Sequence, residues 1–108
     1  MPTSDVFHAI SDPTRRRLLG LLEHGERPVN ALAGEFDMTR PAVSQHLRVL
    51  REAGLVRERR VGRERRYRLH APPLREVSTW VDRYERFWDG RLRALGDQLD
   101  RMADEEER

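Results

Sequence analysis

The chain has 108 residues, a length typical of one domain. It contains no cysteine, which excludes disulfides and thiolate metal sites, and no apolar run of the length of a membrane span or signal peptide. We therefore expect a cytoplasmic protein. The net charge of +2 is unevenly distributed, because residues 39–70 hold 10 Arg against 3 acidic residues while both flanking segments are net acidic. This basic segment indicates a polyanionic partner, and the alternative is a solvated surface.

Two short helices are predicted at the start of the chain. Residues 4–10 begin with Ser-Asp, and residues 11–25 begin with Ser-Asp-Pro, both of which favour a helix N-terminus. The second helix has a buried leucine stripe and a natural stop at Gly25. An extended link follows at residues 27–29, because a residue before proline is disfavoured in the α region.

A helix-turn-helix is predicted over residues 30–54. The first helix is expected to be capped by Asn30, and a turn follows at 37–39. The second helix is expected to begin after Thr39 and to end at Gly54. One face of this second helix is apolar, and the other carries Arg40, Pro41, Ser44, Gln45 and Arg48.

The polar face of the second helix has the chemistry of base recognition. Arg can bond bidentately to guanine and Gln to adenine, which suits Arg40 and Gln45, while Ser44 is short enough to permit close approach. Thr39 and the helix start offer N–H groups to a phosphate, and Arg48 is expected to contact the DNA backbone. The alternative is that this face is simply solvated. His46, between the two faces, is expected to bond to backbone rather than to read a base.

A β-hairpin is predicted over residues 55–70, with its turn at Val61–Glu64. Apolar and charged residues alternate in it, so one face can pack on the helices while the other stays charged. Its arginines are expected to contact phosphates or flank a minor groove. The residues predicted for this role are Arg60, Arg63 and Arg65.

One long helix is predicted over residues 74–103. Its apolar positions recur every 3.5 residues on average, a period that suits a seam between two helices. A homodimer interface is therefore expected, formed by Val6, Ile10, Val77, Trp80, Val81, Tyr84, Phe87, Trp88, Leu92, Leu95 and Leu99. A second interpretation of the aromatic cluster within it is a pocket for a small apolar effector.

Three segments resemble the ArsR/SmtB family of bacterial repressors: VFHAISDPTRRRLLGLL, AVSQHLRVLREAGLV and RRVGRERRYRL. The resemblance covers about residues 5–70. It implies a mainly α fold with a small β-hairpin, a winged helix-turn-helix with a long C-terminal dimerisation helix, within a single domain spanning 1–108. It also implies a homodimer that represses a promoter by binding an inverted-repeat operator in double-stranded DNA. Carried over by position, the family's recognition residues fall on Arg40, Pro41, Ser44 and Gln45, and its wing tip on Gly62 and Arg63.

The chain departs from the metal-sensing members that this resemblance includes. It has no Cys, and no His follows His70 in the segment where the family's interfacial zinc site would fall. We therefore expect the protein to belong to the metal-independent subgroup of the family and to bind no cofactor. No group of residues in the sequence indicates an enzyme. Three alternatives stay open: a metal-responsive repressor using Asp82, Glu85 and Asp89, a repressor responsive to a small ligand, and a winged-helix module that binds only protein.

Overall fold

The computed structural model describes residues 5–106, with side chains described throughout that range except at 89–94 and 105–106. The chain forms two compact units, one ending at Val77 and one beginning at Ser78.

The first unit begins with two short helices whose N-termini are capped as the sequence predicts. Helix α1 spans Val6–Ile10, and the backbone N–H of His8 donates to Asp5 Oδ1 at 2.7 Å. Helix α2 spans Pro13–Leu21, and the N–H of Arg15 donates to Asp12 Oδ2 at 3.1 Å. Of the predicted cap pair Ser4 and Asp5, Ser4 lies outside the described residues.

The predicted helix-turn-helix is confirmed, with one correction at its start. Helix α3 spans Val29–Ala33 and helix α4 spans Arg40–Glu52. Asn30 was expected to cap α3, but it lies inside the helix, and the cap position is Pro28, which has no side-chain hydrogen bond. The reason is that Pro28 already has the extended backbone that a cap position needs (φ −71°, ψ 152°).

Helix α4 begins and ends where the sequence predicts. The Thr39 hydroxyl accepts a hydrogen bond from the N–H of Ala42 at 3.3 Å, and Pro41 lies in the first turn. After the helix, Gly54 has φ +78°, a left-handed conformation that other residues adopt only with strain. This reversal sends the chain directly into the sheet.

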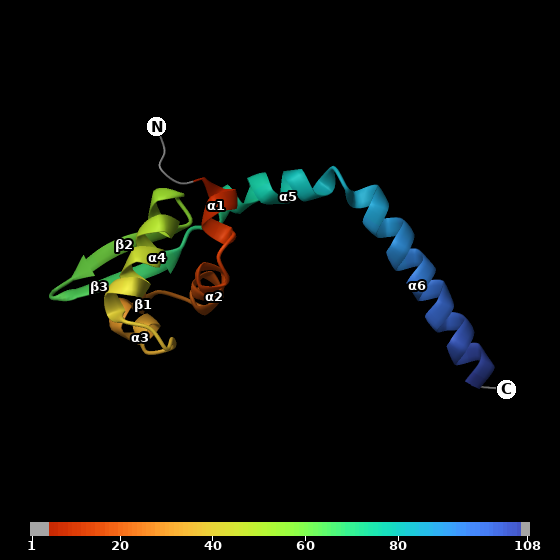
Figure 1. Ribbon diagram of the computed structural model, residues 1–108, viewed down its shortest axis with the longest axis horizontal. Helices are drawn as coiled ribbons and strands as arrows, with labels where there is room; N and C mark the ends of the chain where they lie inside the picture. The colour runs from red at the N-terminus through yellow and green to blue at the C-terminus, as the bar shows by residue number, and fades with distance from the viewer. Residues whose placement is uncertain (1–4, 107–108) are drawn as a thin grey trace. The chain divides into compact units, whose positions relative to one another are not determined.

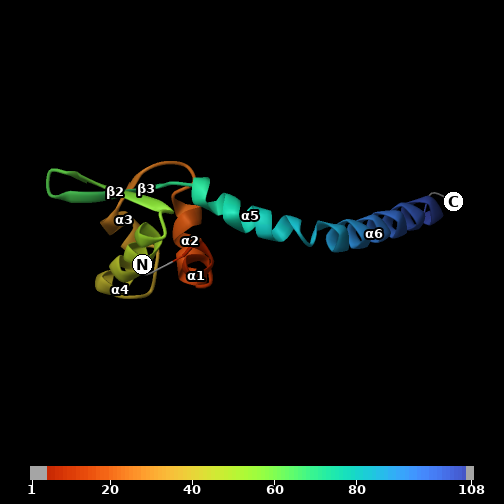
Figure 2. The same cartoon turned by 90° about the horizontal axis from the view of Figure 1, so that it is seen from above.

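The sheet has three strands, one more than the predicted hairpin. Strands β2 (Val56–Val61) and β3 (Glu64–Leu69) form that hairpin, and Gly62 at its turn has φ +64°. The predicted extended link is the third strand, β1 (Arg27–Pro28), which pairs antiparallel with β3 in the order β1-β3-β2. The hairpin projects beyond helices α3 and α4 (Figure 1, Figure 2).

One hydrophobic core joins the elements of the first unit. Leucines from α2, α3 and α4 meet there with β2 and with Tyr67 of β3, and no described side-chain polar atom buried in the unit lacks a hydrogen-bond partner. The core residues are Val6, Ala9, Leu18, Leu22, Val29, Leu32, Val43, Leu47, Leu50, Leu55, Val56 and Tyr67.

The C-terminal helix is interrupted, so the prediction of one helix over 74–103 was wrong. A 3₁₀ turn, η1 (Pro72–Leu74), leads into α5 (Arg75–Asp82), and α6 spans Glu85–Glu106. At the break, the N–H groups of Arg83 and Tyr84 bond to carbonyls three residues back rather than four. The break follows Thr79-Trp80-Val81, a run of β-branched and aromatic residues with low helix propensity. No helix in the described part of the chain is long and apolar enough to cross a membrane.

Candidate nucleic-acid interface

Helix α4 divides into a buried face and an exposed polar face. Val43, Leu47 and Leu50 have no exposed surface, which anchors the helix on the core. The residues predicted to contact DNA lie on the other side: Thr39, Arg40, Pro41, Gln45 and Arg48 are exposed, and Ser44 is half-buried. The core face therefore sets the direction in which the polar face points.

Two side chains at the N-terminal half of α4 have no partner within the described residues. Arg40 and Gln45 are both exposed and make no hydrogen bond or ion pair there. Arg48, by contrast, donates through Nε to Glu52 Oε1 at 3.1 Å, one turn along the helix. Exposed pairs of this type contribute at most about 0.5 kcal/mol, so a phosphate can compete for Arg48, whereas Arg40 and Gln45 are available without such competition.

The hairpin also separates its arginines into available and paired groups. Arg60 and Arg63 lie exposed at the tip end, and neither makes an ion pair with the described residues. Arg65, opposite Arg60 across the hairpin, lies 3.6 Å from Glu58 Oε1. Three of the predicted contacts thus lie together on the projecting hairpin, with Arg60 and Arg63 carrying uncompensated charge.

Two ion-pair clusters in the middle of the hairpin were missed by sequence reasoning. Glu26 Oε1 accepts from Arg59 at 2.9 Å and from Arg66 at 2.8 Å, which ties the segment before β1 to both hairpin strands. Glu58 of β2 pairs with Arg51 of α4, which ties the hairpin to the helix. Glu26 and Arg66 are 40 residues apart, so no local pattern could have indicated their contact.

These contacts shift the pKa values of the groups that form them. The hydrogen bond from Arg59, with those from Arg66 and the two charges, outweighs partial burial and holds the pKa of Glu26 below its ordinary value. The hydrogen bond to Glu64, followed by the one to Glu26, raises the pKa of Arg66. Both groups are therefore charged at neutral pH and hold the segment before β1 against the middle of the hairpin.

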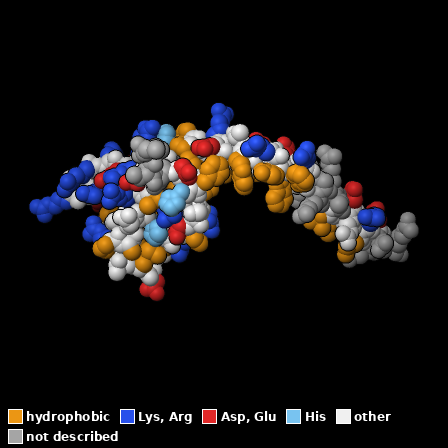
Figure 3. Space-filling model, turned by 45° about the horizontal axis from the view of Figure 1, so that its top comes forward, with side chains coloured by type: hydrophobic (Ala, Val, Ile, Leu, Met, Phe, Trp, Pro, Cys, Tyr) orange, Lys and Arg blue, Asp and Glu red, His pale blue; other side chains and the backbone are white. Residues whose placement is uncertain are grey.

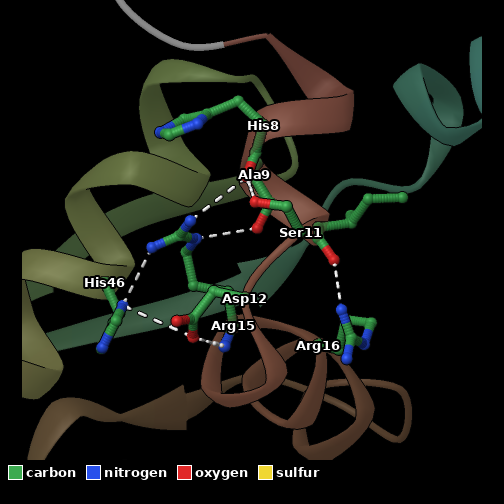
Figure 4. A network of polar contacts seen from close by, with 8 residues as sticks. His8, Ala9, Ser11, Asp12, Arg15, Arg16 and His46 are labelled. Atoms are coloured by element: carbon green, nitrogen blue, oxygen red, sulfur yellow. Dashed lines mark hydrogen bonds and ion pairs between the residues drawn. The ribbon is translucent and has the colours of Figure 1, made fainter.

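His46 contacts side chains, whereas the sequence predicted a bond to backbone. Its Nδ1 lies 3.2 Å from a terminal nitrogen of Arg15 and 3.9 Å from Asp12 Oδ2 (Figure 4). Burial raises the pKa of Asp12, but the Arg15 N–H, the charges of His46 and Arg15 and the Thr14 N–H outweigh it, so the net shift is downward. The contact joins the start of α2 to the middle of α4.

The second unit carries an exposed apolar surface. Trp80, Val81, Tyr84, Phe87 and Trp88 are each 42–55% exposed and line a hollow of about 480 Å³. The rings of Trp80 and Tyr84 meet edge to face, with centroids 5.5 Å apart. Hydrophobic side chains gather along one side of this segment (Figure 3).

The other predicted interface residues fall into three groups. Leu95 and Leu99 are more than half exposed, as an unpartnered interface requires. Ile10 and Val77 are half-buried against the core of the first unit. Val6 is only 5% exposed, so its assignment to an interface was wrong, because its side chain is already buried in the core. The side chain of Leu92 lies outside the described residues.

The described side chains form no group of three or more His, Cys, Asp or Glu residues that could hold a metal ion. The predicted carboxylate cluster includes Asp89, whose side chain lies outside the described residues.

A helix-turn-helix with an exposed polar second helix, followed by a basic projecting hairpin, defines a winged helix-turn-helix DNA-binding protein. The model of the bacterial regulatory protein family arsR matches residues 12–58. The chain belongs to this family of DNA-binding transcriptional regulators, which are not enzymes.

Similar proteins cover most of the chain. The transcriptional repressor SdpR of Bacillus subtilis is 36% identical over 72% of this chain and 87% of its own length. The HTH-type transcriptional regulator Rv2034 of Mycobacterium tuberculosis is 38% identical over 93% of this chain and 91% of its own. A crystal structure of a possible transcriptional regulator for arsenical resistance is 50% identical, with a TM-score of 0.66, over 70% of this chain and 79% of that one. These matches confirm the expected winged fold and the DNA-binding regulator.

Proposed function

We propose that this protein is a homodimeric repressor that binds an inverted-repeat operator in double-stranded DNA without metal control. The observation that carries the proposal is the exposed N-terminal face of α4, where Arg40 and Gln45 are unpaired among the described residues. Both side chains are suited to bidentate contacts with base edges in a major groove. The arginines of the projecting hairpin add sequence-independent contacts to phosphates.

The apolar surface on α5 and α6 supports the homodimer. Soluble proteins rarely leave contiguous aromatic and aliphatic surface of this kind in water. A second copy of the same surface would cover it with two-fold symmetry. Such a dimer presents two α4 helices to half-sites about 34 Å apart on one face of a duplex, which is why an inverted repeat is the expected operator.

Metal independence rests on the ligands that the chain possesses. With no Cys it cannot form the thiolate sites that bind arsenite and soft metals, although one similar protein is described as a possible regulator for arsenical resistance. With no His after residue 70 and no Cys, the last helices offer neither the imidazole nor the thiolate ligands that transition metals prefer.

A second candidate function is favoured by one observation. The hollow lined by Trp80, Tyr84, Phe87 and their neighbours has the volume and apolar walls of a small-ligand site. A repressor with this site would release DNA when an apolar effector binds. The homodimer takes precedence because it also accounts for the exposed Leu95 and Leu99 farther along α6.

Selection of bound duplexes from a random DNA pool tests the proposed function. We expect the selected sequences to converge on an inverted repeat, with half-site centres about one helical turn apart. Recovery of unrelated sequences, with equal affinity for selected and random DNA, would contradict sequence-specific repression. Selection repeated with added apolar compounds distinguishes the effector-responsive alternative.

A further inference from the structure

Arg15 is the most deeply buried charged side chain among the described residues, with 9% of its surface exposed. Its Nε donates to the carbonyl of Ala9 at 2.8 Å, and a terminal nitrogen donates to the carbonyl of His8 at 3.2 Å (Figure 4). These carbonyls belong to the C-terminal end of α1. The negative end of a helix suits a buried cation, so Arg15 is fixed firmly at this junction.

The other terminal nitrogen of Arg15 reaches α4. It lies 3.2 Å from His46 Nδ1. A guanidinium has donors and no acceptor, so Nδ1 must be the accepting nitrogen and the neutral imidazole carries its proton on Nε2. His46 follows Gln45 directly, so the contact fixes α4 beside a side chain expected to read a base.

We propose that His46 is a positioning residue for DNA recognition. Through its contact with the Arg15 guanidinium, it fixes the position of α4, the helix that reads DNA. This inference rests on the proposed function, in which α4 reads base edges. It adds that neutral His46 is required for discrimination between sequences, and that protonation of His46 loosens this discrimination.

Protonation removes the acceptor and places a second cation beside Arg15. The charged groups in contact with His46 are Arg15 and Asp12, at the start of α2. Helix α3 contains no titratable residue, and no charged side chain of α1 or β2 makes a described contact with the imidazole. The Asp12 carboxylate can accept a hydrogen bond from Nδ1–H of the protonated ring. The contact with Arg15 is then lost, because a protonated Nδ1 cannot accept a hydrogen bond from the guanidinium.

The positioning role and a purely electrostatic role predict opposite results. An added positive charge on a DNA-binding surface strengthens binding to any duplex. Loss of a positioning contact weakens binding to the preferred site relative to random DNA. The ratio of the two affinities, measured against pH, therefore distinguishes the two roles.

The test uses the full-length protein, a duplex selected by it at about pH 8 and a random duplex of equal length. Between about pH 8 and about pH 5.5 we expect the affinity ratio to fall about three- to tenfold for each half-site, the effect of one hydrogen bond per subunit. His46→Gln keeps an oxygen acceptor for Arg15 and cannot be protonated, so its ratio should match that of the wild type at pH 8 and stay flat. His46→Leu should show the low ratio at both pH values.

His70→Gln is the matched control. His70 Nε2 also lies near an arginine, Arg57, at 3.3 Å, but outside α4. This variant should keep the pH dependence of the wild type. Circular dichroism at both pH values verifies that each variant is folded. A flat wild-type ratio, a pH step retained in His46→Gln or a step lost in His70→Gln would overturn the proposal.

A measurement without DNA separates this inference from the proposed function. The ¹⁵N spectrum of the imidazoles at about pH 8 should show His46 protonated on Nε2, and protonation on Nδ1 would overturn the positioning contact. If the wild type selects no DNA sequence at pH 8, the proposed function fails. The positioning role in recognition then fails as well, even if His46 is protonated on Nε2.

Discussion

At the scale of single residues, the arginines of the basic segment have different tasks. Arg40, Arg60 and Arg63 are exposed and make no ion pair with the described residues, whereas Arg51, Arg59 and Arg66 bond to carboxylates that hold the hairpin in place. The unpaired arginines are candidates for DNA contacts. The paired ones determine where those contacts are presented.

Substitution on α4 should affect sequence discrimination. Arg40→Ala or Gln45→Ala should cost about 1–3 kcal/mol on the selected duplex, because each removes a candidate contact to a base edge. Titration of selected and random duplexes with the variants measures this effect. An equal loss on both duplexes would show that these side chains contact only the backbone.

Substitution at the hairpin tip should affect all duplexes alike. Arg63→Ala removes a candidate phosphate contact and should lower the slope of log affinity against log salt by about 0.9 per contact, or twice that in a dimer. Binding measured over a range of salt concentrations tests this. A change in the preferred sequence would instead assign Arg63 to base readout.

The Glu26 cluster should give a pH-dependent contribution to stability. Because the pKa of Glu26 is lower in the fold than its ordinary value of 4.5, the contribution is present above that value and is lost as pH falls through the lowered pKa. Glu26→Gln should therefore melt below the wild type at pH 7, with the difference shrinking below about pH 4.5.

The control for this experiment is Glu23→Gln, because Glu23 is exposed and makes no described ion pair. It should have the melting temperature of the wild type at both pH 7 and pH 3. A difference between Glu26→Gln and the wild type that is equally large at pH 3 and pH 7 would contradict the role of the ionised carboxylate.

At the scale of elements, α4 depends on both of its ends. The Thr39 hydroxyl bonds to the N–H of Ala42, and Gly54 allows the reversal into β2. The Thr39 cap fixes the N-terminal turn that carries Arg40, and Gly54 fixes where the helix gives way to the sheet. Thr39 is therefore structural as well as a candidate phosphate contact.

Loss of the α4 cap should lower stability. Thr39→Ala should reduce the free energy of unfolding by about 1 kcal/mol, because one N–H at the helix start loses its acceptor. Thr39→Ser keeps the hydroxyl and should stay close to the wild type. Urea denaturation followed by circular dichroism compares the two variants, and equal stability of Thr39→Ala and the wild type would show that the cap contributes nothing.

At the scale of the whole molecule, the apolar surface on α5 and α6 is the feature that requires a partner. Trp88→Glu places a charge on that surface and should yield a monomer with no specific DNA binding. Light scattering measures the mass of wild type and variant, and circular dichroism verifies the helical content. A folded wild-type monomer at micromolar concentration that still binds its selected duplex tightly would contradict the homodimer.

Metal addition should not release DNA. Zinc, nickel, cadmium or arsenite should change the affinity for the selected duplex by less than about threefold, a coupling below about 1 kcal/mol. Calorimetry measures metal binding directly. A tight stoichiometric site whose occupancy releases DNA would establish the metal-responsive alternative.

Local sequence signals were enough to predict the elements that depend on neighbouring residues. The Ser-Asp-Pro and Thr caps, the apolar stripe of α4, Gly54, and the turn at Gly62 are all local signals, and each predicted an element that the structure contains. The fold class and the polar face of α4 followed from them, because helix periodicity places residues three and four apart on one face.

Other features depend on residues far apart in the sequence or on competing local preferences, and these could be seen only in the folded chain. Pairing of β1 with β3, the bonds from Glu26 to Arg59 and Arg66, and the Arg15–His46 contact each join segments more than 30 residues apart. The apolar period of residues 74–103 predicted a continuous helix, yet helix α5 ends at Asp82 and α6 begins at Glu85. The prediction missed this interruption because a hydrophobic repeat does not measure local helix propensity. Val6 has the same apolar character in a core as in an interface, so only the fold could show that its side chain is already buried.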